Sequence, residues 1–305
     1  METRKIGSLD VTLAGLGCNN FGWRIDAAAT KQVVDAALDA GINFFDTANV
    51  YGGGQSEEFL GAALKGKRDK AVIATKFGME MPDGGKGAKP AYIKTAVEAS
   101  LKRLDIDVID LYQLHRPDED TPIADTLGAL DELVKEGKVR EIGGSNFSAA
   151  QVEEAEKAVQ QGAARFVSLQ NHYSLFHREP EKDVLPTCAA HGIGFLPYFP
   201  LANGLLTGKY RKGKPFPESS RAADGWGPKM FTEENLDKVE ALIQLAEGAG
   251  HTLLELAFSW LAARPEVSSV IAGAKTAEQV QANAKAADWK LTKDQLAEID
   301  RVMSA

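Results

Sequence analysis

Short apolar runs alternate with longer segments of helical periodicity along the chain. Most of the short runs are apolar at consecutive positions, which is typical of parallel strands covered by helices on both faces. The pattern therefore predicts repeated strand-then-helix units. Eight strands are expected, at 13–17, 43–46, 71–76, 108–114, 139–143, 166–169, 193–197 and 269–272.

The segments between the strands carry helix signals. Residues 30–40 end at Gly41, in the position of a C-cap glycine. A helical stripe also joins Leu253, Leu256, Ala257 and Trp260, which favours a core position for these side chains. Further helices are expected at 90–104, 123–135, 149–161, 181–190 and 277–287.

Eight strand-helix units predict an α/β fold of the closed (β/α)₈ TIM barrel type, with sites at the carboxyl ends of the strands. The length of 305 residues also allows two domains of about 150 residues, but the unit count favours a single domain over 1–305. The alternative is an open doubly wound sheet. Its cofactor turn needs a third glycine, which Gly15-Leu16-Gly17 lacks.

Two segments fall outside the eight units. Residues 2–12 resemble a small β-hairpin that would close the bottom of the barrel. Residues 208–228 are rich in Gly, Pro, Lys and Arg, and we expect them to form an irregular, lid-like loop.

Composition narrows the function classes. The chain is 44% hydrophobic and 26% charged with a net charge of −8, and no basic stripe indicates a nucleic-acid partner. Cys18 and Cys188 lack a metal or redox spacing and suit a reducing compartment. No run of about 18 apolar residues and no amino-terminal leader is visible. We expect a cytoplasmic protein with a small-molecule substrate and no membrane partner; the sequence does not indicate an oligomeric state.

Polar residues directly after the apolar strands should meet at one barrel mouth. Asp46 follows Phe44-Phe45, and Lys76 follows Val72-Ile73-Ala74-Thr75 at the end of the strand at 71–76. His115 follows the strand at 108–114, and Tyr51 lies in the loop after Asp46. The same position at later strand ends is held by Ser145, Asn146, Gln170, Asn171 and Tyr198.

The first four of these residues form a set able to move a proton. A lysine in an apolar site stays charged beside a carboxylate such as Asp46. Its ammonium favours the phenolate of a neighbouring tyrosine, so that Tyr51 becomes a usable proton donor and acceptor. His115 would orient the reacting oxygen. The set therefore fits protonation of a carbonyl oxygen as hydride arrives, and it offers no acyl-transfer nucleophile and no metal cage.

Ordered motifs along residues 5–300 make the chain similar to the aldo-keto reductase family. They include Gly41-Ile42-Asn43-Phe44-Phe45-Asp46-Thr47-Ala48-Asn49-Val50-Tyr51-Gly52, Ala74-Thr75-Lys76-Phe77-Gly78, Leu111-Tyr112-Gln113-Leu114-His115, Gly143-Gly144-Ser145-Asn146-Phe147, Tyr198-Phe199-Pro200-Leu201 and Val270-Ile271-Ala272-Gly273-Ala274-Lys275.

The resemblance implies that aldehydes or ketones are reduced to alcohols with a nicotinamide cofactor. It makes Asp46, Tyr51, Lys76 and His115 the catalytic tetrad, with Tyr51 as general acid. The implied cofactor residues are Gly17, Asp46, Ser145, Asn146 and Gln170, the ring of Tyr198, the segment Phe199, Pro200, Leu201, Ala202 and Gly204, the loop cations Lys209 and Arg221, and Gly273, Lys275, Gln279 and Asn283 at the adenosine end.

The chain departs from the family pattern at several of these positions. Phe199 stands where many relatives carry serine, and Gly273-Ala274 and Gln279 replace a Lys-Ser pair and an arginine of some relatives. Lys275 is then expected to supply most of the charge for a 2′-phosphate. NADPH is favoured as cofactor over NADH. The substrate pocket is expected to include Trp23, Tyr51, His115 and Trp226, with the loop at 79–89.

Two other functions remain open from the sequence. The first is a regulatory binding protein that resembles the potassium-channel β subunits, which keep the fold and cofactor while acting on a partner. The second is a lyase that forms a Schiff base through Lys76, since barrel enzymes host such lysines.

Overall fold

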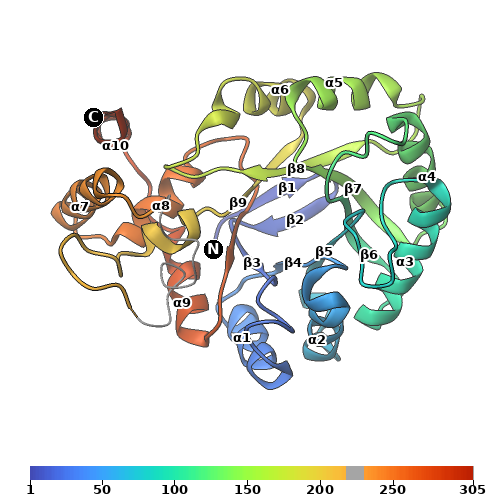
Figure 1. The fold of residues 1–305 in the computed structure, drawn as a ribbon, viewed down its shortest axis with the longest axis horizontal. Coiled ribbons are helices and arrows are strands. Elements are labelled where there is room, and N and C mark those ends of the chain that lie inside the picture. Colours follow the sequence, from blue (N-terminus) through green and yellow to red (C-terminus); the bar gives the residue numbers. More distant parts are fainter. Residues whose placement is uncertain (218–229, 305) are drawn as a thin grey trace.

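The computed structural model of the chain describes residues 1–217 and 230–304. Within them, eight parallel strands form one sheet in the order β10-β3-β4-β5-β6-β7-β8-β9, with the helices arranged around it (Figure 1). The amide of Phe195 donates to the carbonyl of Glu266 at 2.7 Å, and the amide of Ser268 donates to the carbonyl of Phe195 at 2.9 Å. These bonds join β9 to the residues before β10 and nearly close the barrel.

The eight strands coincide with the apolar runs of the sequence, shifted by one to three residues at some ends. Their bounds are β3 Ala14–Gly17, β4 Phe44–Asp46, β5 Val72–Phe77, β6 Ile109–Leu114, β7 Val139–Ser145, β8 Phe166–His172, β9 Gly194–Tyr198 and β10 Val270–Gly273.

Helices cover the outside of the barrel, and several of them begin at residues that favour a helix start. Pro90 opens α3 at a position where its missing N–H costs nothing, and Ser148 with Gln151 forms a capping box at the start of α5. The helices are α1 Ala27–Asp39, α2 Gln55–Leu64, α3 Pro90–Leu104, α4 Ile123–Lys135, α5 Ala149–Ala158, α6 Val184–His191, α7 Glu233–Gly248, α8 Leu253–Ala262, α9 Ala277–Ala286 and α10 Lys293–Ser304, with short 3₁₀ helices at Tyr51–Gly54, Arg68–Lys70, Glu179–Glu181 and Ala202–Thr207.

The amino-terminal segment forms the expected hairpin, β1 Thr3–Ile6 and β2 Leu9–Thr12, paired antiparallel. Three of its side chains, Ile6, Leu9 and Val11, are fully buried. They pack with the inward-facing Phe44, Ala74, Leu111, Leu196 and Ile271 of the barrel. The hairpin therefore closes one end of the barrel, and burial of its apolar side chains stabilises this arrangement.

Part of the loop expected to act as a lid is not described. Residues 208–217 follow the 3₁₀ helix Ala202–Thr207, whereas Arg221 and Trp226 lie outside the described residues. None of the helices in the described ranges combines the length and apolar character needed to cross a bilayer.

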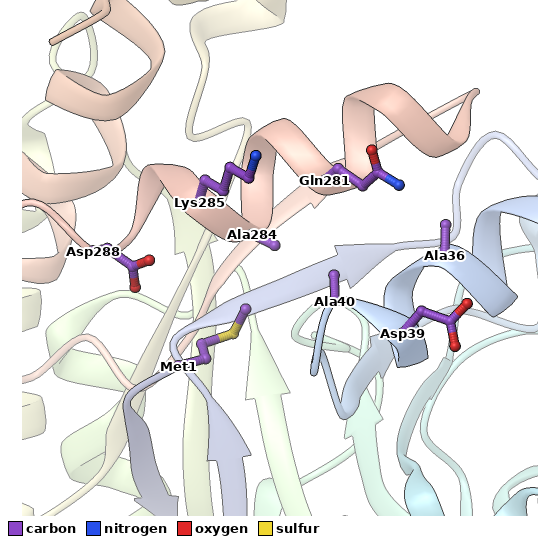
Figure 2. A pocket seen from close by; sticks show the side chains of 8 residues that line it. All are labelled: Met1, Ala36, Asp39, Ala40, Gln281, Ala284, Lys285 and Asp288. Carbon is purple, nitrogen blue, oxygen red and sulfur yellow. The ribbon is translucent and has the colours of Figure 1, made fainter.

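A small hollow of about 280 Å³ lies between α1 and α9 beside the amino terminus. Figure 2 shows Asp39 on α1, Lys285 on α9 and Asp288 just after α9 around it, with the side chain of Met1. It shares no residue with the larger cavity at the strand ends, and it contains no side chain of the expected tetrad. The expected chemistry therefore belongs to the larger cavity.

Candidate active site

Asp46 and Lys76 face the barrel interior because of strand alternation. Phe44 and Ala74 point inward, and the side chains two residues later point to the same side. Asp46 is paired in register with Ala74. The two charged groups thus enter the upper end of the barrel from neighbouring strands.

Lys76 is fully buried, and its charge is balanced directly. Its ammonium lies 2.6 Å from Oδ2 of Asp46 and donates a second hydrogen bond to the carbonyl of Thr47 at 2.8 Å. A buried ion pair is tolerated only when its remaining hydrogen-bonding capacity is also used. The geometry meets that condition for the lysine.

The second oxygen of Asp46 is held by two buried amides. The Nε2 atom of Gln170 donates to Oδ1 at 2.9 Å, and the Nε2 atom of Gln113 donates to the same oxygen at 3.3 Å. Asp46 is therefore fixed from three strands. Gln113 was not singled out by sequence reasoning, although it lies two residues before His115 on β6.

Tyr51 reaches this pair from a glycine turn. Gly52, Gly53 and Gly54 all adopt positive φ, at 58°, 65° and 106°, a region in which residues with a side chain are strained. The Tyr51 ring lies 5.2 Å from the Lys76 ammonium and meets the His115 ring edge-on, with centroids 5.8 Å apart. The structure thus brings together all four side chains expected from the sequence.

The helix after this turn is bonded to residues just after β3 and β4, to β5 and to α3. Ser56 on α2 donates to the carbonyl of Cys18 at 2.9 Å and bonds Thr47 at 2.7 Å. The buried carboxylate of Glu57 accepts from Thr75 at 2.6 Å and pairs with Arg103 at 2.7 Å. Tyr51 is consequently held in place through α2 rather than by its own turn alone.

The pKa of Tyr51 differs from the expectation that Lys76 would make its phenolate more accessible. Burial raises the pKa of Tyr51, and the Lys76 ammonium lowers it only in part. The effect of Lys76 has the expected sign, but desolvation of the phenolate is larger, so the hydroxyl is a weaker acid than a free tyrosine. Burial is the largest single influence on the pKa of Lys76 and would lower it, but Asp46 and Tyr51 act together in the opposite direction and the net pKa is raised.

His115 is arranged to stay neutral. Burial, followed by the charges of Lys76 and Arg116, lowers its pKa well below the usual value. Its Nδ1 atom is buried and has no hydrogen-bond partner among the described residues. A neutral imidazole in this position is able to bond a reacting oxygen without competing for the proton of Tyr51.

Asp46, Tyr51 and His115 line a cavity of about 680 Å³, whereas Lys76 is buried behind them. Most residues expected to bind the cofactor line it, and Ala202 is buried behind its wall. Of the expected cofactor and substrate residues, those lining it are Gly17, Asp46, Tyr51, His115, Ser145, Asn146, Gln170, Tyr198, Phe199, Pro200, Leu201, Gly204, Lys209, Gly273, Lys275, Gln279 and Asn283.

Trp23 is not brought into this cavity. Its side chain is 64% exposed, and the guanidinium of Arg24 lies 4.4 Å over its ring. Arg24, rather than Trp23, lines the cavity. Trp23 was expected in the substrate pocket because its loop was assigned to the substrate site, and the turn at 20–25 directs the ring outward instead.

An aromatic stack supports Tyr198. Its ring is nearly parallel to that of His172, with centroids 5.5 Å apart, and His172 stacks on His177 at 3.8 Å. The hydroxyl of Tyr198 donates to Oδ1 of Asn146 at 2.8 Å, and Asn146 in turn donates to the carbonyl of His115 at 2.9 Å. The ring plane is therefore fixed from behind and at its edge.

The backbone after β9 turns sharply along the cavity wall. Phe199, Ala202 and Asn203 adopt positive φ of 51°, 47° and 57°, and Gly204 reaches 97°. Such strain in residues with side chains is usually found at functional sites. Further along the cavity, the amide of Lys275 donates to Oε1 of Gln279 at 2.8 Å, next to the start of α9.

Several lining residues were missed by sequence reasoning. Thr207 and Leu254 carry no distinctive motif, and their approach to the cavity depends on how the chain folds back after β9. Asn20 lies in the turn after β3, where its Oδ1 atom is buried without a hydrogen-bond partner among the described residues. Arg116 directly follows His115, a position that could have identified it.

Comparison with known proteins decides the family. A model of the aldo/keto reductase family matches residues 14–304. The chain belongs to the aldo/keto reductase family. It is therefore an oxidoreductase of carbonyl groups, and the cofactor of this family is a nicotinamide nucleotide.

Relatives of this reductase carry different names. It is 38% identical to a probable voltage-gated potassium channel subunit beta of Arabidopsis thaliana, with 94% of this chain and 92% of the relative covered. It is 33% identical to the L-glyceraldehyde 3-phosphate reductase of Escherichia coli (strain K12), with 99% and 92% covered. Both similarities extend over almost the whole chain.

Solved structures agree with the fold of the reductase. A glycerol dehydrogenase from Gluconobacter oxydans gives a TM-score of 0.87 at 32% identity, with 99% of this chain and 95% of that chain covered. An aldo-keto reductase from Bacillus halodurans in its holo form gives 0.82 at 34%, with 99% and 96% covered.

The cavity of this reductase fits a dinucleotide. Its volume lies within the range of about 300–1,000 Å³ found for cofactor and ligand pockets. A Cβ atom added at Gly273 would approach Oδ1 of Asn19 to 3.0 Å, so a side chain at this position would narrow the cavity between the two residues. The unpartnered Oδ1 of Asn20 and Nδ1 of His115 are polar atoms that a bound molecule is able to satisfy.

Proposed function

We propose that this aldo-keto reductase converts aldehydes or ketones to alcohols with NADPH, and that Tyr51 donates the proton. The single observation that carries the proposal is the fixed Asp46–Lys76 pair beneath the Tyr51 ring at the end of the cavity. A bound reduced nicotinamide supplies the hydride to the carbonyl carbon.

The protein residues provide the proton and the orientation. The hydroxyl of Tyr51 donates to the carbonyl oxygen, and the neighbouring Lys76 ammonium stabilises the phenolate that remains. Neutral His115 orients the same oxygen. Because Asp46 fixes the lysine and is itself fixed by Gln170 and Gln113, the positive charge stays in place during the reaction.

We assign the two ends of the cavity to the two halves of the cofactor. The Tyr198 ring is proposed to stack on the nicotinamide, with Ser145 and Asn146 at its carboxamide. The turn from Phe199 to Gly204 would meet the pyrophosphate with backbone groups. Lys275 and the amino end of α9 would attract the adenosine phosphate, which favours NADPH over NADH.

Gln170 has a different immediate task from the one expected. Its side-chain amide donates to Asp46, while its backbone carbonyl accepts from Ser145 Oγ at 2.7 Å. We propose that it contributes to cofactor binding mainly by holding Asp46 and Ser145. We also propose one domain over 1–305 and a reducing, cytoplasmic setting, which the buried free thiols of Cys18 and Cys188 suit.

The test is a panel of neutral aldehydes and ketones assayed with NADPH and NADH in parallel. Oxidation of the reduced cofactor that depends on the carbonyl supports the proposal, and a lower KM for NADPH supports the cofactor preference. Absence of turnover with every carbonyl would contradict it.

A second candidate function is regulation of a channel-type partner, which the similarity to the Arabidopsis protein favours. It predicts cofactor binding with negligible turnover and co-purification with a membrane protein. The Schiff-base lyase is disfavoured, because Lys76 is held as an ammonium by Asp46 and a lysine nucleophile must be neutral. Borohydride reduction that traps substrate on Lys76 would reverse that judgement.

A further inference from the structure

Arg116 places a positive charge beside the proposed catalytic residues. It directly follows His115 at the end of β6, and its exposed side chain lines the same cavity as Tyr51, His115 and Tyr198. Arg116 therefore lines the part of the cavity that also contains Tyr51 and His115.

The charge of Arg116 has no partner within the part of the chain that the structure describes. In residues 1–217 and 230–304, no ion pair or hydrogen bond engages the side chain of Arg116. The nearest acid in sequence, Asp118, instead accepts from the amide of Ala88 at 2.7 Å, the amide of Asp120 at 3.1 Å and the hydroxyl of Thr121 at 2.8 Å. The carboxylate of Asp118 is therefore bonded within its own loop and forms no ion pair with Arg116.

The field of Arg116 reaches both sides of the catalytic end. It contributes, after burial and Lys76, to the low pKa of His115. It also opposes the rise that burial causes in the pKa of Tyr198. A group bound between these two rings would therefore feel the guanidinium charge.

The other cations that line the cavity have different surroundings. Lys275 lies by the start of α9, Lys209 lies over the Tyr210 ring at 5.0 Å, and Arg24 stacks on Trp23. Lys209 and Lys275 belong to the proposed cofactor site. Arg116 is set apart from them by its position next to His115.

We propose that Arg116 binds an anionic group, a carboxylate or a phosphate, carried by the carbonyl substrate. The planar guanidinium fork matches the paired oxygens of either group. The protein has a net charge of −8, so a small anionic substrate is repelled overall and needs a local cation at the site. This inference rests on the proposed reductase function and names its substrate class.

The experiment compares substrates that differ in one anionic group. Glyceraldehyde is paired with glyceraldehyde 3-phosphate, and butanal is paired with 4-oxobutanoate, each assayed with wild-type enzyme, Arg116→Gln and Arg116→Lys. The quantity measured is the ratio of kcat/KM for the anionic member to that for the neutral member. For at least one pair, Arg116→Gln should lower this ratio by about tenfold or more, since a charge-assisted hydrogen bond is lost.

The two pairs distinguish the two anions. A selective loss with the phosphate pair alone identifies a phosphorylated substrate, and a loss with the carboxylate pair alone identifies an oxo acid. Arg116→Lys should retain part of the ratio, because it keeps the charge without the fork. Higher ionic strength should lower the wild-type ratio more than that of Arg116→Gln.

Two controls separate a contact with the substrate from a change in overall charge or in cofactor affinity. Arg301→Gln removes one positive charge from the exposed face of α10, where Arg301 pairs with Glu298, and should leave the ratio at the wild-type value. The Kd for NADPH, measured by quenching of protein fluorescence, should be the same for wild type and Arg116→Gln, since the arginine is assigned to the substrate.

Three results would overturn the inference. They are an unchanged ratio for both pairs in Arg116→Gln, an equal loss on the anionic and neutral members, and a weakened Kd for NADPH that accounts for the whole effect. Each is distinct from failure of the reductase function itself, which would appear as absence of wild-type turnover with glyceraldehyde and butanal.

Discussion

Lys76 is the residue on which the proposed chemistry depends most. It is fully buried, donates to Asp46 and Thr47, and lies 5.2 Å from the centre of the Tyr51 ring. Desolvation disfavours the phenolate of Tyr51, and the ammonium is the main group opposing that effect. The lysine therefore acts by keeping a buried tyrosine able to exchange its proton.

Replacing Lys76 with methionine should reduce turnover by about 100-fold or more, the usual contribution of general acid-base catalysis. Removal of the ammonium leaves burial unopposed, so the pKa of Tyr51 rises further. In alcohol oxidation the phenolate accepts the proton, and activity increases as pH approaches that pKa. The midpoint of the pH–rate curve for oxidation should therefore move to higher pH in Lys76→Met.

The stability of the same variant provides its control. Loss of the ammonium leaves Asp46 buried without its ion-pair partner, which costs about 3–5 kcal/mol of unfolding free energy. The double variant Lys76→Met/Asp46→Asn should recover part of this stability in urea unfolding and none of the activity. A pH–rate curve for Lys76→Met that matches wild type would contradict the role assigned to Lys76.

At the scale of elements, α2 carries the Tyr51 loop against the barrel. Ser56 bonds Cys18 just after β3, and Glu57 bonds residues of β5 and α3, so the first turn of α2 is fixed at three places. The other end of the contact is Gly61, at which a Cβ atom would lie 2.2 Å from the carbonyl oxygen of Leu104. The absence of a side chain thus sets how closely α2 approaches α3.

Gly61→Ala should lower the unfolding free energy by about 1–3 kcal/mol, since the added methyl group overpacks a backbone contact. A matched control is Gly128→Ala on α4, where the added Cβ meets no atom within 4 Å. That change should raise stability by about 0.5–1 kcal/mol through helix propensity alone. Both values can be measured by urea unfolding, and equal effects at the two positions would refute the close-contact argument.

Much of the element layout could be predicted from the sequence. Residues 90–104 and 123–135 form helices with the expected bounds, because their apolar periodicity is strong and Pro90 marks a helix start. Strands were found because both faces are buried, so apolar runs are continuous. Helix α2 was not predicted: it begins directly after three glycines, and its polar residues Ser56 and Glu57 are buried by tertiary contacts.

The site residues that lie at the carboxyl ends of strands could be predicted from the sequence. Asp46, Lys76 and His115 converge because parallel strands present their carboxyl ends together. The net pKa of Tyr51 and the outward direction of Trp23 could not be predicted, since both depend on burial in the folded molecule. Apart from its position after His115, Arg116 has no distinguishing signal in the sequence, because a loop arginine is ordinarily a solvated charge.

At the scale of the whole molecule, the net charge of −8 opposes binding of an anionic cofactor. We expect local compensation from Lys209 and Lys275, which line the cavity, and from backbone amides at the start of α9. Affinity for the cofactor should accordingly depend on a few placed cations and fall as salt screens them.

Lys275→Met should raise the Kd for NADPH by about tenfold, since a charge-assisted contact with a phosphate is lost. The Kd for NADH should change less, because that cofactor lacks the 2′-phosphate. Fluorescence titration at low and high salt measures both values. Equal losses for the two cofactors would show that Lys275 does not discriminate between them.

The barrel, its amino-terminal hairpin and the tetrad together support one central claim, that Tyr51 donates the proton during carbonyl reduction. The most direct measurement is single-turnover oxidation of enzyme-bound NADPH by an aldehyde that wild type reduces, followed by the absorbance of the reduced nicotinamide, in wild type and Tyr51→Phe. Proton donation by Tyr51 predicts an unchanged Kd for NADPH and a rate constant lower by about 10²–10⁴-fold in the variant. A rate constant near the wild-type value would contradict it.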